Sequence, residues 1–172
     1  SNDPTSAPAR DNVVVQARQL TASFHELSTR FDTARRNADT EIAESVTQIN
    51  QLGSQVAQLN EQIIAGGSDV ETLRDRRDVA VSQLAELAGV TVSTRNDGAV
   101  DLAIGNGRPL VIGYSSFAVG SAPSGSDGFA AISTGGFDIT SEIAGGTIGG
   151  LLHLRDTVVP GYQASLDQLA FD

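Results

Sequence analysis

The 172 residues contain no cysteine, lysine or tryptophan, and only two histidines and two tyrosines. Without cysteine, disulfides, thiol catalysis and cysteine-ligated metal sites are excluded. All eleven basic residues are arginines, and 21 acidic residues give a net charge of −10. This charge argues against nucleic acid or an anionic membrane surface as a partner, because both attract basic proteins. No apolar run is long enough to span a bilayer.

The first residue is Ser1 and no methionine precedes it. We therefore expect the sequence to be an internal fragment of a longer protein, and the missing targeting signal excludes little. Residues 1–8 are polar and contain two prolines, which predicts a loose lead-in.

A long helix is predicted from residue 9 to residue 65, because proline is absent from this stretch and Gly53 is its only glycine. Apolar residues recur there in steps of four and three, a spacing that keeps one stripe of a helix against a partner helix. Between Ala38 and Ile49 the steps run 4-4-3, which relaxes a supercoil without breaking the helix. The stripe is rich in alanine, which favours a close-packed bundle over an isolated zipper. Its members are Val13, Ala17, Leu20, Phe24, Leu27, Phe31, Ala34, Ala38, Ile42, Val46, Ile49, Leu52, Val56, Leu59 and Ile63.

A second helix is predicted over residues 69–88. Gly66 and Gly67 end the first helix, and Ser68 and Glu71 have the spacing of a capping box. The short connection predicts that the second helix packs antiparallel to the first, and Gly89 is expected to end it.

After Gly89 the apolar period changes to two. Residues 90–94 and 100–104 predict a hairpin about Asn96-Asp97-Gly98. Further short strands are expected at 110–112, 117–119, 129–133 and 137–139, with an exposed tip at 121–128. Together they predict one small antiparallel meander.

Helical spacing returns over residues 147–172, where Pro160 is expected to cause a kink or a fresh first turn. The predicted fold class is α+β, an elongated antiparallel bundle of three helices. A small antiparallel β lobe is inserted between the second helix and the last. We divide the chain into a lead-in, a helical hairpin, the β lobe and a returning helix that closes the bundle, and together these form one rod-like domain: 1–8, 9–88, 89–146 and 147–172.

Residues able to carry out catalysis are few. His25 and His153 fall in different predicted helices, and no nucleophile elbow of the G-x-S-x-G type occurs. The glycine-rich turn at 145–150 has no P-loop lysine, so re-entry into the bundle explains it better than a phosphate site. We predict no catalytic, cofactor or metal site and a protein that is not an enzyme.

Charged residues cluster at 74–78 (RDRRD) and again at Arg155-Asp156. Guanidinium groups can bridge carboxylates on neighbouring helices or subunits. A solvated helix face with incidental ion pairs is the alternative. The candidate ion-pair residues are Arg74, Asp75, Arg77, Asp78, Arg155 and Asp156.

Three stretches, in order, resemble the FlgK family of flagellar hook-associated proteins, which join hook to filament. They are 50–63 (NQLGSQVAQLNEQI), 73–78 (LRDRRD) and 146–156 (GTIGGLLHLRD), the last followed by Pro160, Tyr162 and 166–170 (LDQLA). The resemblance covers nearly the whole chain. Arg74 and Arg76 depart from the family pattern, which usually has an apolar residue and glutamine there.

The resemblance implies an extracellular axial protein of the bacterial flagellum, secreted through the flagellar type III export channel. Its implied partners are neighbouring copies of itself, the hook protein and the second junction protein. An export chaperone would bind a C-terminal segment that this chain lacks, along with the terminal helices of the inner tube. The isolated fragment is then expected to be an elongated monomer.

Two other classes of protein remain as alternatives. A flagellin-like surface protein or an extracytoplasmic helical-bundle sensor would bind a ligand, and aromatic or charged residues would have to converge on one pocket. A wall-cutting hydrolase would need paired carboxylates such as Asp138 and Glu142. The ordered motifs favour the structural junction subunit over both.

Overall fold

The computed structural model describes residues 7–124 and 127–171. Its longest element is α1 (Ala7–Ala65), an unbroken helix of 59 residues and about 88 Å at 1.5 Å per residue. The helix passes through the change of spacing after Ala38 without interruption, as predicted. It begins earlier than expected, because Pro8 lies in its first turn, where the missing N–H has no helical partner to lose. Residues 1–6 of the predicted lead-in lie outside the described residues.

The second helix, α2 (Val70–Ala88), runs back along the C-terminal half of α1. The predicted capping box is wrong. Asp69 holds the N-cap position without a side-chain cap bond, and the Ser68 hydroxyl instead lies 3.3 Å from the Asp69 carboxylate. The helix therefore starts one residue later than expected, with the Leu73 N–H donating to the Asp69 carbonyl. Gly89 ends it in the left-handed conformation, as predicted.

The β lobe contains two antiparallel sheets instead of the single meander predicted. The break falls at Phe117 and Ala118, because the next residue bonds to α1. The Asn50 side chain exchanges two hydrogen bonds of 2.8 Å with the backbone of Val119. The first sheet has the order β1 (Thr91–Thr94), β2 (Val100–Ile104), β3 (Arg108–Ile112), β4 (Ser115–Ser116), and the second the order β5 (Val119–Pro123), β6 (Ala130–Thr134), β7 (Phe137–Asp138).

The final helical segment comprises α3 (Gly146–His153), one π-helical turn η2 (Leu154–Val158) and α4 (Val159–Phe171), preceded by the short 3₁₀ turn η1 (Thr140–Glu142). Pro160 lacks an N–H and cannot continue an ordinary α-helical ladder. The chain accommodates it by widening the preceding turn, where the Val159 N–H donates to the Leu154 carbonyl five residues back. The expected kink is therefore a π turn.

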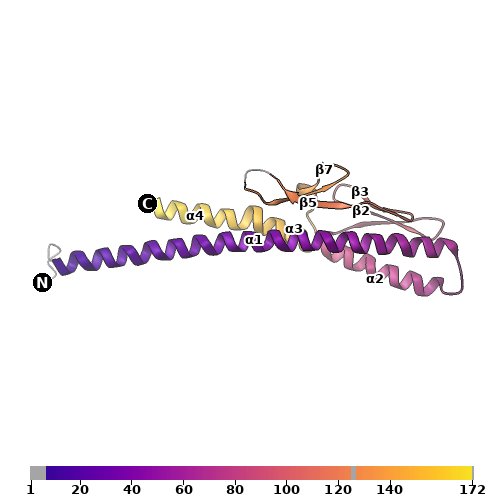
Figure 1. Ribbon diagram of the computed structural model, residues 1–172, viewed down its shortest axis with the longest axis horizontal. Coiled ribbons are helices and arrows are strands. Elements are labelled where there is room, and N and C mark those ends of the chain that lie inside the picture. The colour runs from indigo at the N-terminus through magenta and orange to yellow at the C-terminus, as the bar shows by residue number, and fades with distance from the viewer. Residues whose placement is uncertain (1–6, 125–126, 172) are drawn as a thin grey trace.

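The three helices do not lie abreast. The backbone of Gly89, at the end of α2, closely approaches Gly145, where α3 is about to begin. From there α3 and α4 continue along α1 toward its N-terminus. The β lobe lies on the same side of α1 as α4, and α2 lies on the opposite side (Figure 1). The Phe31 and Tyr162 rings stack at 6.1 Å between α1 and α4. The chain is thus an elongated α+β rod with the lobe inserted into its return track, which confirms the predicted fold class.

The core lies where α1, α2, α3 and the two sheets meet. Alternate residues of β2 point inward, as their period of two predicts. On α1 the buried stripe begins only at Ala38, whereas Val13 is 65% and Leu20 59% exposed. The N-terminal part of the predicted stripe, which includes Val13 and Leu20, is therefore exposed in the described part of the chain. The largest fully buried side chains are Ile42, Ile49, Val56, Asn60, Leu84, Leu102, Ile104, Leu110, Val111, Ile132, Ile139 and Ile148.

Two adjacent glycines of α3 give opposite predictions. A Cβ on Gly150 meets nothing within 4 Å, so Gly150→Ala should stabilise the fold by about 0.5–1 kcal/mol through helix propensity. A Cβ on Gly149 would lie 2.6 Å from the backbone carbon of Ala144, so Gly149→Ala should destabilise it. Urea unfolding of both variants tests this pair. A lower midpoint for Gly150→Ala would contradict it.

Candidate functional site

Arg155 joins three elements. It lies in η2 with only 3% of its surface exposed. Its Nη1 donates to the Asp39 carboxylate of α1 at 2.5 Å and to the Ala130 carbonyl of β6 at 2.9 Å, while Nε donates to Asp156 at 2.7 Å. Burial would lower the pKa of Arg155, but hydrogen bonds and charges from Asp156 and Asp39 outweigh it and raise the pKa. The guanidinium therefore stays charged inside the fold.

A second arginine, Arg35, packs at the place where Arg155 joins α1, β6 and η2. The Arg35 guanidinium of α1 stacks on the Phe129 ring at 4.3 Å, and that of Arg155 lies 5.4 Å from the same ring. Arg35 Nε also donates to the Arg155 carbonyl at 3.0 Å. These contacts hold the start of β6 against the middle of α1.

Arg77 is the corresponding buried arginine of α2. Its Nη1 donates to the Gly98 carbonyl at 2.7 Å, which ties α2 to the turn between β1 and β2. Its Nε and Nη2 lie 3.2 and 3.1 Å from the Asp78 carboxylate. The buried guanidinium of Arg77 therefore stabilises the contact between α2 and the β lobe of the same chain.

The remaining candidates are more exposed. Arg74 pairs with Glu71 at 2.6 Å on the surface of α2, and Asp75 lies exposed beside it. The structure thus places the six candidate residues in two clusters, four on α2 and two on η2. A role in contacts between subunits stays a prediction for all six.

Two asparagines of α1 were missed as positioning residues in the sequence. Asn60 is fully buried, and its amide donates to the carbonyls of Val100 and Gly113 at 2.8 and 2.6 Å. Its carbonyl accepts from the Val100 N–H at 3.1 Å. Asn50 pairs with Val119 in the same manner. A polar residue inside a strongly apolar helix stripe is the signal that could have drawn attention to both.

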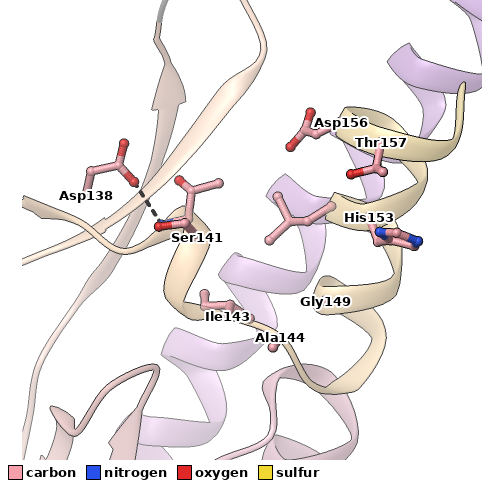
Figure 2. A pocket seen from close by; sticks show the side chains of 10 residues that line it. Asp138, Ser141, Ile143, Ala144, Gly149, His153, Asp156 and Thr157 are labelled. Atoms are coloured by element: carbon pink, nitrogen blue, oxygen red, sulfur yellow. Dashed lines mark hydrogen bonds between the residues drawn. The ribbon is translucent and has the colours of Figure 1, made fainter. Parts of the chain in front are cut away.

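A cleft of about 690 Å³ lies between η1 and the α3–η2 segment. Figure 2 shows Asp138 and Ser141 on the strand side, with His153, Asp156 and Thr157 on the helix side. His153 thus lies on one wall of an open cleft with both polar and apolar lining residues, whereas His25 lies far along α1. Among the described residues, no group of three or more potential metal ligands occurs and no buried side-chain polar atom lacks a partner. Of the described helices, none has the length and apolarity of a membrane span.

Asp138 at this cleft predicts a pH effect. Hydrogen bonds from Thr140, from its side chain first and then its backbone N–H, lower the pKa of Asp138. A lowered folded pKa means that the stabilisation is present above the unfolded value, about 3.9, and is lost as pH falls through the folded value. Asp138→Asn should therefore flatten the fall in stability below about pH 4. Denaturation curves of both proteins at several pH values check this, and parallel pH profiles would contradict it.

The fold and its anchored lobe define the class: an elongated helical-rod domain with a small inserted β lobe. Over residues 1–172 the chain matches the family model of the flagellar hook-associated protein FlgK helical domain. The chain belongs to this family, which confirms the resemblance found in its motifs.

The relatives give the same family. The flagellar hook-associated protein 1 of Salmonella typhimurium is 30% identical over 114 residues, which are 62% of this chain and 21% of that protein. Its Escherichia coli counterpart is 28% identical over the same length. The flagellar hook junction protein FlgK of Burkholderia pseudomallei superposes with a TM-score of 0.85 at 31% identity, covering 96% of this chain and 32% of that one. The matched part of this chain spans about a fifth of the length of the curated relatives.

Proposed function

We propose that the full-length protein is a structural axial subunit of the bacterial flagellum that joins the hook to the filament. The observation that carries this proposal is the match to the FlgK helical domain along all 172 residues. The superposition on a solved hook junction protein supports it. The role is structural and not catalytic, because this domain offers a rod and a lobe for repeated contacts.

The shape of the domain suits a layer of subunits. A helix of about 88 Å presents a long side to neighbours, and equivalent contacts repeated about an axis build a closed ring or a tube. In this role residues 9–88, 89–146 and 147–172 act as one rod-like domain. Among the six charged candidates, Asp75 is the one we assign to contacts with a neighbouring subunit.

The proposed location is outside the cell, after secretion through the flagellar export channel. The absence of cysteine is compatible with export of an unfolded chain. The proposed partners are copies of the same protein, the hook protein and the second junction protein. An export chaperone would bind a segment outside this chain.

Deletion of the gene in the source organism tests the proposal. Cells should keep their hooks, lose their filaments and release flagellin monomers into the medium, and the wild-type gene should restore swimming. Intact filaments and normal swimming in the deletion strain would overturn the junction role.

A further inference from the structure

An exposed aromatic groove lies on the β lobe, apart from the polar anchors described above. It has a volume of about 440 Å³ and lies between β3 of the first sheet and the β6–β7 hairpin of the second. Phe137 of β7 and Phe117 of the sheet-to-sheet connection line it and are 59% and 41% exposed. Exposed aromatic side chains around a hollow are typical of binding surfaces, because burying them supplies much of the association energy.

Arg108 gives this groove a positive charge. Its guanidinium lies 4.8 Å from the centre of the Phe137 ring, and the carboxylate of Glu142 is 3.7 Å away. Its side chain is 37% exposed, so donors remain available to a second carboxylate. The groove thus fits an apolar side chain that has a carboxylate beside it.

The chain itself carries such a pair on α2. Val79 is 59% exposed, and Asp75 is exposed four residues earlier. Residues four apart on a helix lie on the same face, so the isopropyl group and the carboxylate are presented together. The opposite charges of Asp75 and Arg108 favour the approach of these two surfaces.

Within one chain, the aromatic groove and the face of α2 that carries Asp75 and Val79 cannot contact each other. The β lobe rises from one side of α1 and α2 lies on the other (Figure 1). A contact between these two different surfaces therefore joins two copies of the chain in a heterologous, head-to-tail manner. Repeating such a contact can build a closed ring.

We propose that the Phe117–Phe137 groove of one subunit receives Val79 and Asp75 of the neighbouring subunit. The inference rests on the proposed function, since it names the contact that holds adjacent subunits of the layer together.

The test uses the full-length protein in flagellated cells, with the photo-crosslinking residue p-benzoylphenylalanine in place of Phe137. Irradiation should give a covalent dimer, and mass spectrometry should join position 137 to a peptide of α2. The matched control places the same residue at Val92, which is 46% exposed on β1, and should give no such dimer. No dimer, a crosslink to another protein, or a dimer joined outside α2 would overturn the contact.

A charge exchange gives a second measurement. Asp75→Arg should weaken the crosslink from position 137 severalfold, and adding Arg108→Glu should restore it. No loss in the single variant, or no recovery in the double variant, would count against the pairing. Presence of the protein at the hook end is checked in the same cells by immunogold labelling. Protein located there without the crosslink refutes only this contact, whereas protein missing there in swimming cells refutes the junction role.

Discussion

Replacing the buried arginine, as Arg155→Met, should destabilise the fold by about 3–5 kcal/mol, because it leaves the buried part of the Asp39 carboxylate without its partner charge. The change also removes the bond to the Ala130 carbonyl, so α1, β6 and η2 lose their common contact. Urea unfolding followed by circular dichroism measures the effect.

The control for this change is Arg30→Met. Arg30 forms its ion pair with Glu26 on the surface of α1, where both side chains are more than half exposed. Exposed pairs contribute at most about 1 kcal/mol, so this variant should stay close to wild type. Equal losses in the two variants would show that Arg155 is an ordinary surface residue in solution.

Asn60→Leu should cost about 2–4 kcal/mol, since it leaves buried backbone groups of Val100 and Gly113 without hydrogen-bond partners. Leucine has a similar size, so the loss comes from unsatisfied polar groups more than from a cavity. Hydrogen exchange should also show faster exchange of the Val100 amide, because its acceptor is gone.

The matched variant is Gln58→Leu, which makes the same change of amide to leucine at an exposed position two residues earlier on α1. It should change the free energy of unfolding by less than about 0.5 kcal/mol. An Asn60→Leu protein as stable as Gln58→Leu, with unchanged exchange at Val100, would mean that the bonds contribute no net stability.

Features set by local spacing could be predicted from the sequence, whereas features set by contacts between distant residues could not. The continuity of α1 depends on local spacing, so the pattern from Val13 to Ile63 was sufficient to predict it. The division of the lobe into two sheets depends on Asn50, which bonds to Val119 far along the chain. No local pattern links two such positions.

The arginine candidates show the same limit. The adjacent Arg155 and Asp156 predict an ion pair, and that pair is present. Its shortest hydrogen bond, however, is with Asp39, 116 residues earlier, which only the folded chain brings near. The position of Pro160 predicted a disturbance of the helix, but the choice of a π turn depends on keeping both flanking segments packed on α1.

Asp39, Asn50 and Asn60 hold the lobe at three places along α1, and the outer two are about 32 Å apart at 1.5 Å per residue. All three side chains accept hydrogen bonds from backbone N–H groups of the lobe, so each is bonded to the main chain and not to a mobile side chain. A β lobe that is hydrogen-bonded to α1 at three separated positions cannot pivot about any single one of them. A load that pulls the lobe along the rod would therefore be shared among the three hydrogen-bonded positions.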